Sequence, residues 1–495
     1  MLTRFLFLSF ISGLTLLALA NCTKIQEVES FAPGNLPQAV ITNIVANGGG
    51  SLYCSISGGC PIHLTGTNFF KKARVYVGSY PCEDVVVSND FTTIDCNVGP
   101  GQNGVYNISV KNIDNQTSTF DAAVSATAMQ FSYASFLYVG VQNSPGEVLG
   151  YAQHPTTGAL LPVSGNPYIT GGNGTYGVAM SMNNRFLFSA NFTSGTITTF
   201  AINPLNGGLS MVGSPMANDA NGPNGLFVHP SGQFLYITNN TSSSISAYSI
   251  GSTGTLTQVT GSPFSSLPAR RLNGITGSSD GRFIFAAAGV NNNTYNGVAA
   301  FTVDTTTGAL TLVSGTPFKN PDDGSISNRG DGISIHPNGR WLYMGLFGQQ
   351  KMAAWNIDQT TGALTPLGTP VDNNNPGYDD DGGSASIVSA DGSFLYGTAF
   401  SRVNEANSER IITYSIAASG TLSKVSDTTT EGGPNDIRID TTGNFAYTCN
   451  TLSPPSISAY SVNKTTGALS PLSPAYYLIS APSDGPAIMI MQINR

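Results

Sequence analysis

Charged residues are scarce in this chain. Of its 495 residues only 10% are Asp, Glu, Lys or Arg, against about 25% in an average soluble protein. Coiled coils and helical repeats need Glu, Lys and Arg at helical spacing, so this scarcity excludes both classes. Lys and Arg number 20 against 28 Asp and Glu, and they form no run of four or more. Because nucleic-acid binding needs a positive face that neutralises phosphates, we expect no nucleic-acid partner.

Histidine is rarer still, with four scattered residues, and no Cys-x-x-Cys pair occurs. A zinc site is therefore a poor fit to this sequence. Glycine (57 residues) and proline (28) are abundant, and 20 Tyr and 25 Phe supply the aromatic side chains that a disordered chain would lack. This composition is typical of a globular protein made of short strands and turns, and we predict an all-β fold.

The first 21 residues have the composition of a signal peptide: Arg4 is followed by an apolar run over residues 5–20. The run from Leu19 to Cys22 resembles a bacterial lipobox, in which the cysteine becomes the lipidated first residue. Asn21 departs from the strict pattern, in a way that spirochaete lipoproteins tolerate. The resemblance implies a lipid anchor on Cys22 and a membrane as partner.

Residues 22–36 are polar and contain two prolines, so we interpret them as a tether behind that anchor. The expected location is the bacterial cell envelope, at the outer membrane or the cell surface. Simple secretion, or residence in the periplasm, is the alternative.

Short alternating segments separated by turns fill residues 37–131 and predict a β-sandwich. The run from Gly58 to Phe69 resembles the immunoglobulin-like IPT/TIG domain, which implies an interaction or spacer module without chemistry of its own. We expect His63, in the middle of this strand, to be a surface-facing structural residue. Exported proteins carry disulfides, and two cysteine pairs in this domain lie at spacings that hairpins can bridge, Cys54-Cys60 and Cys82-Cys96. The second pair also falls where extracellular members of the family place a disulfide.

From residue 132 to residue 495 two markers recur seven times, 46 to 58 residues apart. A period near fifty made of short strands and turns predicts a seven-bladed β-propeller, because about four strands fit each unit. One marker is a turn glycine before an apolar pair, and the other is an aromatic residue that opens a strand. The glycines are Gly158, Gly208, Gly254, Gly308, Gly362, Gly420 and Gly467; the aromatics are Phe136, Phe186, Phe234, Phe283, Trp341, Phe394 and Phe445.

The first unit begins at its aromatic strand, whereas the chain ends with a surplus strand at residues 487–493. We therefore expect this last strand to pair into the first blade and close the ring, which removes the free sheet edges. We also expect Cys449, inside a strand-like stretch, to be a buried thiol.

The runs from His229 to Tyr236 and from His336 to Tyr343, together with the Thr-Gly-Ala-Leu turns, resemble the seven-bladed lactonase-type propeller family. This family includes bacterial 6-phosphogluconolactonase. The resemblance implies the fold and raises lactone hydrolysis as an activity, but propellers also serve as binding proteins and scaffolds.

A ring of polar residues is expected where the innermost strands converge at the mouth of the central channel. Counting ten residues back from each aromatic marker gives one polar residue in six blades, and the closing strand adds a seventh. We predict that this ring binds a protein or carbohydrate ligand; capping of strand ends and binding of channel water is the alternative. The residues are Tyr176, Asn224, Asn273, Asp331, Ser384, Asn435 and Asp484.

Lactone hydrolysis needs a base or an activated water, and a group that stabilises the oxyanion. No histidine falls at a channel position, and we expect His229 and His336 to make structural hydrogen bonds in their turns. Binding without catalysis is therefore our expectation, with lactonase activity as the alternative. Catalysis would fall to carboxylates with an arginine partner: Asp331, Asp381, Asp436 and Asp484, with Arg271 or Arg329.

Two acidic loops precede the innermost strands of neighbouring blades, so their carboxylates could hold Ca²⁺, which prefers oxygen ligands. Solvated acidic loops without a metal are the alternative, and we expect no other cofactor. The candidate ligands are Asp323, Asp331, Asp380 and Asp381.

Overall fold

The computed structural model describes residues 37–46, 53–55, 58–102, 104–120, 130–204, 206–265, 271–289, 297–319, 329–347, 351–372, 383–399, 409–451, 454–479 and 486–491. These residues form strands and turns and contain no helix, so the predicted all-β class is confirmed. None of the described segments is a helix with the length and hydrophobicity of a membrane span. The signal peptide, the tether and Cys22 lie outside the described residues, as do Asp323, Asp380, Asp381 and Asp484.

The chain divides into two compact units, and the main boundary falls between Ser132 and Tyr133. In the first unit the pairing order of the strands is β7-β4-β5-β6-β3-β1-β8. Strand β5 pairs with β4 at its start and with β6 along the rest of its length, so it joins two layers. Along β3 buried and half-buried residues alternate, as expected of a sandwich strand. The bounds are β1 (Val40–Ala46), β3 (Cys60–Thr67), β4 (Arg74–Val77), β5 (Tyr80–Val87), β6 (Thr93–Val98), β7 (Gly104–Lys111) and β8 (Thr119–Phe120); β2 (Tyr53–Ser55) lies between β1 and β3 in the sequence.

One of the two predicted disulfides is present. Cys54 and Cys60 are bonded, whereas Cys82 and Cys96 are free thiols, so the prediction for that pair was wrong. Cys82 lies opposite Val98, which places Cys96 at a diagonal position on the neighbouring strand. At this position the Cys96 thiol is close enough to Cys82 to interact with it. This contact with Cys82, together with burial, raises the pKa of the Cys96 thiol far above its usual value.

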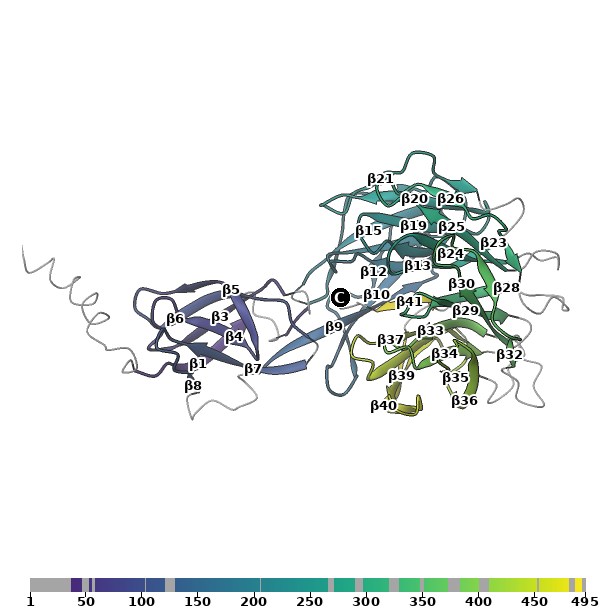
Figure 1. The fold of residues 1–495 in the computed structure, drawn as a ribbon. Coiled ribbons are helices and arrows are strands. Elements are labelled where there is room, and N and C mark those ends of the chain that lie inside the picture. The colour runs from purple at the N-terminus through teal and green to yellow at the C-terminus, as the bar shows by residue number, and fades with distance from the viewer. Residues whose placement is uncertain are drawn as a thin grey trace, which may run out of the picture. The chain divides into compact units, whose positions relative to one another are not determined.

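The second unit is a ring of seven antiparallel blades, and Figure 1 labels many of their strands. Their strands are: blade 1, β41 (Pro486–Met491), β9 (Gln130–Val141), β10 (Glu147–Gln153), β11 (Leu160–Pro162), β12 (Tyr168–Ile169); blade 2, β13 (Thr175–Met180), β14 (Phe186–Asn191), β15 (Thr196–Ile202), β16 (Leu209–Met211), β17 (Met216–Ala217); blade 3, β18 (Pro223–Val228), β19 (Phe234–Asn239), β20 (Ser244–Ile250), β21 (Leu256–Gln258), β22 (Phe264–Ser265); blade 4, β23 (Arg271–Gly277), β24 (Phe283–Gly289), β25 (Gly297–Val303), β26 (Leu310–Leu312), β27 (Phe318–Lys319); blade 5, β28 (Arg329–Ile335), β29 (Trp341–Phe347), β30 (Lys351–Ile357), β31 (Leu364–Pro366), β32 (Val371–Asp372); blade 6, β33 (Gly383–Val388), β34 (Phe394–Ala399), β35 (Arg410–Ile416), β36 (Leu422–Thr429); blade 7, β37 (Pro434–Ile439), β38 (Phe445–Asn450), β39 (Ser456–Val462), β40 (Leu469–Leu478).

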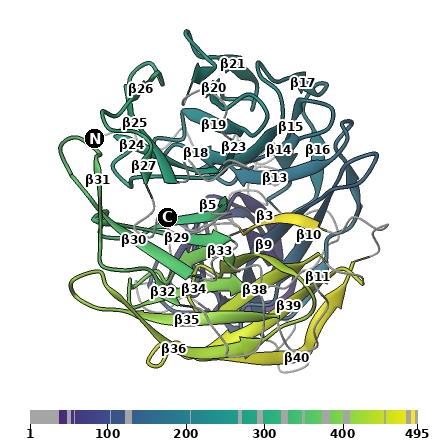
Figure 2. The same ribbon diagram turned by 90° about the vertical axis from the view of Figure 1, so that its right-hand side faces the viewer.

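The ring closes as the sequence predicts. Strand β41, from the C-terminal end of the chain, pairs antiparallel with β9 and forms the innermost strand of blade 1. Figure 1 shows this yellow strand beside the blue strands of that blade, and Figure 2 shows the blades arranged in a ring. Two distant parts of the sequence therefore complete one blade, and blade 1 has an innermost strand like the other six.

The two sequence markers contact each other between neighbouring blades all around the ring. A Cβ added to the turn glycine of each blade would fall within 3 Å of the aromatic marker of the preceding blade; Gly308 against Phe234 is one case, at 2.5 Å. In blade 2 the glycine in contact is Gly207, one residue before the Gly208 chosen from spacing, because Gly207 has the left-handed φ of 71° that the turn needs. Each turn therefore packs one blade onto the next, and the hydrophobic clusters likewise span neighbouring blades.

Buried hydrogen bonds also connect neighbouring blades at these contacts, which we call the seams between blades. The Tyr343 hydroxyl donates to the Gly420 carbonyl in the next blade at 2.9 Å. Tyr138, Tyr236 and Tyr447 make the corresponding bond in their blades. His229 and His336 are buried and lie within hydrogen-bond distance of a turn carbonyl in the next blade through Nε2, which confirms their structural role.

Candidate functional site

The channel mouth is shaped by a bulge near the start of every innermost strand. Each of the seven strands β41, β13, β18, β23, β28, β33 and β37 shows a register shift against its neighbour at this point. The residues left out of the pairing include every member of the predicted polar ring that lies on these strands: Tyr176, Asn224, Asn273, Asp331, Ser384 and Asn435. A bulge leaves a residue without a partner in the strand pairing and redirects its side chain. The predicted ring residues are therefore distinguished from their neighbours by the strand pairing itself.

Small residues next to the bulges let the strands converge. A Cβ on Gly177 would lie 2.1 Å from the Asn224 carbonyl oxygen of the next blade, and one on Gly332 would lie 2.2 Å from the Ala385 Cα. These positions therefore accept only glycine or a residue almost as small, as the sequence suggested. In blade 7 the equivalent position holds Asp436, whose side chain is 7% exposed.

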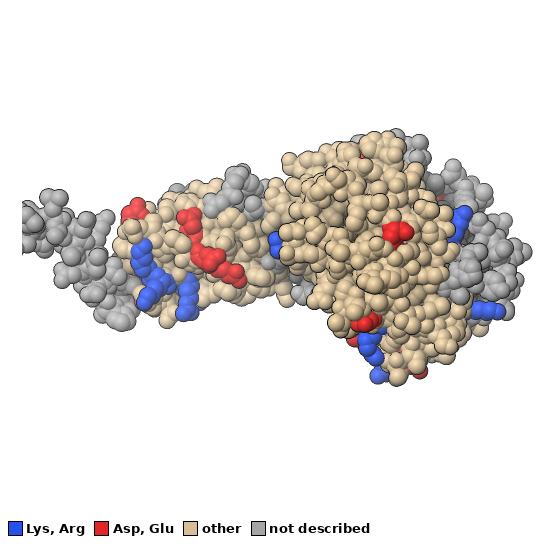
Figure 3. Space-filling view, turned by 90° about the horizontal axis from the view of Figure 1, so that it is seen from above, with Lys and Arg blue, Asp and Glu red and all other residues tan. Residues whose placement is uncertain are grey.

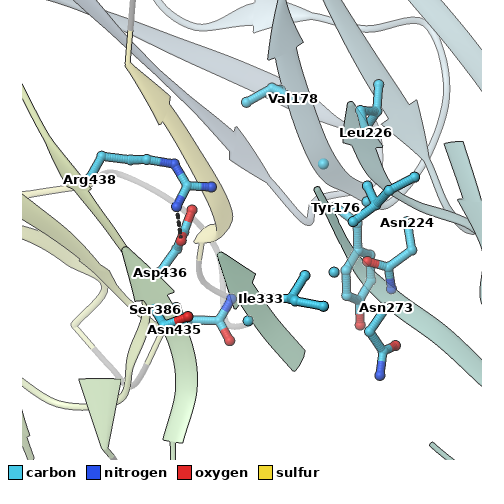
Figure 4. Close-up of a pocket in the computed structure, with 16 residues that line it drawn as sticks. Tyr176, Val178, Asn224, Leu226, Asn273, Ile333, Ser386, Asn435, Asp436 and Arg438 are labelled. Carbon is cyan, nitrogen blue, oxygen red and sulfur yellow. Dashed lines mark hydrogen bonds and ion pairs between the residues drawn. The ribbon is translucent and has the colours of Figure 1, made fainter. Parts of the chain in front are cut away.

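The converging strands line a cavity of about 140 Å³ that is open to solvent. Its volume is close to that of an engineered cavity that binds benzene. All of its lining residues come from six innermost strands, β13, β18, β23, β28, β33 and β37. Figure 4 shows two walls. Tyr176, Asn224 and Asn273 form one wall, while Asp436, Arg438 and Asn435 form the other, with Ser386 beside Asn435.

An ion pair marks the second wall. Arg438 Nη1 donates to Asp436 Oδ1 at 2.6 Å and to the Ile437 carbonyl oxygen at 2.8 Å. The Ile437 amide also donates to Asp436 Oδ1, at 2.9 Å. Because two donors fix the carboxylate, the arginine is held at the edge of the cavity by a charge-assisted bond.

The first wall offers amides and an aromatic ring. The Tyr176 ring packs at 4.9 Å from the Phe192 ring, which holds it in place. Asn273 Oδ1 accepts from Asn240 Nδ2 at 2.5 Å, so its orientation is also fixed. Primary amides donate and accept hydrogen bonds, and tyrosine adds an apolar face with a polar tip. Such a wall matches the hydroxyl groups and ring faces of a sugar.

Of the predicted ring residues, Tyr176, Asn224, Asn273 and Asn435 line the cavity together, and so does the candidate carboxylate Asp436. In blade 6 the lining residues are Ala385 and Ser386, next to the predicted Ser384. Arg271 lies at the start of β23, is exposed and does not line the cavity. The side chains of Arg329, Asp331 and Ser384 and all of Asp381 and Asp484 lie outside what the structure describes.

Sequence reasoning missed Arg438. The signal was available, since Arg438 lies two residues after Asp436 on the same strand and so points to the same face. Within the described residues no group of three or more His, Cys, Asp or Glu side chains could hold a metal ion. The proposed Ca²⁺ ligands Asp323, Asp380 and Asp381 fall outside those residues, as does the side chain of Asp331.

Cys449 lies behind this wall, opposite Asp436 in the pairing of β37 with β38, and is fully buried. Burial, with a smaller effect of the Asp436 charge, raises the pKa of the Cys449 thiol well above its usual value. The thiol therefore stays protonated and packs as an apolar group, as the sequence predicts.

A model of the family "Lactonase, 7-bladed beta-propeller" matches residues 208–326 and 330–481, and one of the IPT/TIG domain matches residues 40–133. No curated protein matches the sequence. Among solved structures, the chain resembles a periplasmic gluconolactonase from Pseudomonas aeruginosa (19% identity, TM-score 0.59, 72% of this chain and 99% of that one). It also resembles a Bacteroides uniformis protein for which 6-phosphogluconolactonase activity has been suggested (17% identity, TM-score 0.60, covering 72% and 99%).

At these identities the structural likeness establishes the fold alone, whereas the first family match spans more than half of the chain. The chain therefore belongs to the seven-bladed lactonase-type β-propeller family, and carries an IPT/TIG domain ahead of the propeller.

Proposed function

We propose that the propeller binds a small polyhydroxylated carboxylate, a sugar acid or its lactone, at the channel mouth and does not hydrolyse it. The observation that carries the proposal is the position of Arg438, held by Asp436 on one wall of the cavity and facing the amides of Asn224 and Asn273 on the other. Both hydrogen bonds that Arg438 makes with described residues use Nη1. Its Nε and Nη2 groups can therefore donate to a ligand carboxylate in the paired geometry typical of arginine.

Binding is favoured over turnover because the Asp436 carboxylate already accepts hydrogen bonds from the protein. A general base must accept a proton from the attacking water, yet Asp436 Oδ1 already accepts from Arg438 and from the Ile437 amide. No histidine is among the described residues that line the cavity. The same residues suit a binding site, where a fixed arginine and fixed amides lower the cost of ordering side chains.

Lactone hydrolysis is the second candidate, and the pairing of a buried carboxylate with an arginine favours it. In that reaction Asp436 would orient the attacking water, and Arg438 would stabilise the oxyanion. The family name and the gluconolactonase name of a similar structure point the same way.

Calorimetric titration of residues 37–495 with gluconate and with glucose tests the binding proposal. We expect gluconate to bind at least tenfold more tightly than glucose, because only gluconate offers a carboxylate to Arg438. Equal affinity for the two, or no binding of either, contradicts the proposal. Incubation with a panel of sugar lactones, with and without EDTA, tests the second candidate and any need for Ca²⁺. Turnover that Asp436→Asn abolishes would replace binding by hydrolysis as the function.

We also propose that the protein is exported and anchored in the bacterial envelope through a lipidated Cys22, with the IPT/TIG domain spacing the propeller from the membrane. The apolar run of residues 5–20 ahead of the cysteine, and the disulfide of Cys54 with Cys60, support export. Metabolic labelling with an alkyne fatty acid should mark the full chain and leave a Cys22→Ser variant unmarked. Labelling of both chains alike would overturn the anchor.

A further inference from the structure

The sandwich unit carries its positive charge on one face. Lys72, Arg74 and Lys111 are exposed, and together they form what we call the basic face. Val75 is buried on β4, so its neighbours Arg74 and the half-exposed Tyr76 point outward on the other side of the strand. Lys72 is exposed in the turn that precedes this strand. In Figure 3 the blue side chains of this unit gather along its lower edge, and the red ones lie above them.

Three features of the residues on this face do not contribute to the stability of the fold. Arg74 lies directly opposite Lys111 in the pairing of β4 with β7, and like charges in such pairs are destabilising. Lys72 has a φ of 69°, a left-handed conformation that glycine or asparagine adopts at much lower cost. Among the described residues none of the three cations forms an ion pair.

Several of the other charged side chains in this unit have structural partners. Asp95 pairs with His63 at 2.7 Å, Asp84 accepts from Asn97, and Lys71 Nζ donates to the Val87 carbonyl oxygen at 2.8 Å. Lys111 is the exception on the basic face, since its Nζ lies 5.4 Å above the Tyr76 ring. That cation–π contact steadies the lysine and leaves its charge outward. Natural proteins place residues that are locally unfavourable for stability mainly at functional sites, so a cluster of such residues indicates a site.

We propose that the basic face of the IPT/TIG domain binds the anionic phospholipid headgroups of the membrane in which the chain is anchored. The proposal rests on the lipid anchor proposed above. An anchor on Cys22 leaves residues 23–36 before the first described residue, and a fully extended chain of that length reaches about 50 Å at most. The sandwich is therefore confined near the membrane surface. There each Lys or Arg gains about 1 kcal/mol from anionic lipid, which for three residues is a preference of about a hundredfold.

Vesicle flotation of residues 37–495 tests the proposal without the anchor, and this chain keeps every strand that the structure describes. We expect partitioning onto vesicles of phosphatidylglycerol and phosphatidylcholine to exceed that onto pure phosphatidylcholine by about a hundredfold. The preference should disappear in 1 M NaCl, where the screening length falls to about 3 Å.

The triple variant Lys72→Asn, Arg74→Gln, Lys111→Gln should lose the preference, and asparagine keeps the left-handed turn. A matched control neutralises three exposed arginines of the propeller, Arg185→Gln, Arg282→Gln and Arg340→Gln, and should keep it. Equal loss in both variants, no preference in the parent chain, or binding to heparin without binding to vesicles would overturn the proposal. Failure here leaves fatty-acid labelling of Cys22 intact, and failure of labelling leaves vesicle binding intact, so the two proposals fail separately.

Discussion

The sandwich and the propeller are both all-β, yet they are stabilised by different kinds of contact. In the propeller one set of contacts recurs around the ring, with a turn glycine on an aromatic ring and a tyrosine hydroxyl on a turn carbonyl. The sandwich unit depends on single contacts, such as Lys71 with the Val87 carbonyl and Cys82 with Cys96. Stability of the propeller should therefore depend on closure and on its seams, and the following changes test this difference.

Removal of residues 486–495 should have the largest effect, because it takes away β41 and leaves β9 with a free inner edge. We expect the propeller to lose at least several kcal/mol and its cooperative unfolding, while the sandwich keeps its own transition. Differential scanning calorimetry of the parent and shortened chains separates the two units. An unchanged melting temperature of the propeller would contradict the closed-ring topology.

Alkaline pH should weaken the propeller before the sandwich. Burial raises the pKa of Tyr151 to about 12, and burial also raises the pKa of Tyr248 and Tyr396 to about 12, from an ordinary value of 10.0. Each contributes stability that is complete below pH 10, the pKa in the unfolded chain, and is lost as the pH rises to 12. At pH 11 the cost is about 1 kcal/mol for each tyrosine.

Urea unfolding at pH 8 and pH 11, followed with tyrosinate absorbance, measures this loss. The sandwich tyrosines Tyr76, Tyr80 and Tyr106 are only half-buried, so its transition should move less. Equal shifts of both transitions would show that tyrosine burial does not distinguish the two units.

Gly308→Ala should cost about 2 kcal/mol or more. The new Cβ would lie 2.5 Å from the Phe234 ring, at a backbone φ of 78°. Gly368→Ala is the matched control, because Gly368 has a φ of 73° and nothing within 4 Å of the added carbon. Its cost should be limited to the conformational term of about 1 kcal/mol. Equal destabilisation of the two variants, measured by urea unfolding, would show that the contact between the turn glycine and the aromatic ring does not stabilise the propeller.

Tyr343→Phe should have the smallest effect, about 1 kcal/mol, because it leaves the buried Gly420 carbonyl without its donor. The buried Tyr396 hydroxyl has no hydrogen-bond partner among the described residues, so Tyr396→Phe should be neutral or slightly stabilising. Chemical denaturation of the two variants gives the comparison. A larger loss for Tyr396→Phe than for Tyr343→Phe would rule out the hydroxyl bond as a seam contact.

The same difference explains what could be predicted from sequence. A contact that repeats seven times leaves seven copies of its residues at a fixed spacing, which is why Phe234, Gly308 and the closing strand were found. Counting back from the aromatic residues also gave the bulged residues, such as Asn224 and Asn273, although the bulges themselves leave no pattern of their own.

Features that occur once were harder to predict. Arg438 was missed because the candidates came from counting back nine and ten residues from each aromatic marker, whereas Arg438 lies seven residues before Phe445. The bond between Cys82 and Cys96 was wrongly expected because spacing says nothing about register, and the structure places the two residues diagonally. Charge separation on the sandwich likewise depends on which strands become neighbours, here β4 and β7.

Calorimetric titration of gluconate into three forms of the chain tests the central claim most directly. The forms are the parent protein, Arg438→Gln, and the control Arg271→Gln, which removes an exposed charge outside the cavity. We expect gluconate to bind the parent and Arg271→Gln with similar affinity, and to bind Arg438→Gln at least tenfold more weakly. Equal affinity for all three forms would contradict recognition of a sugar acid by Arg438 at the channel mouth.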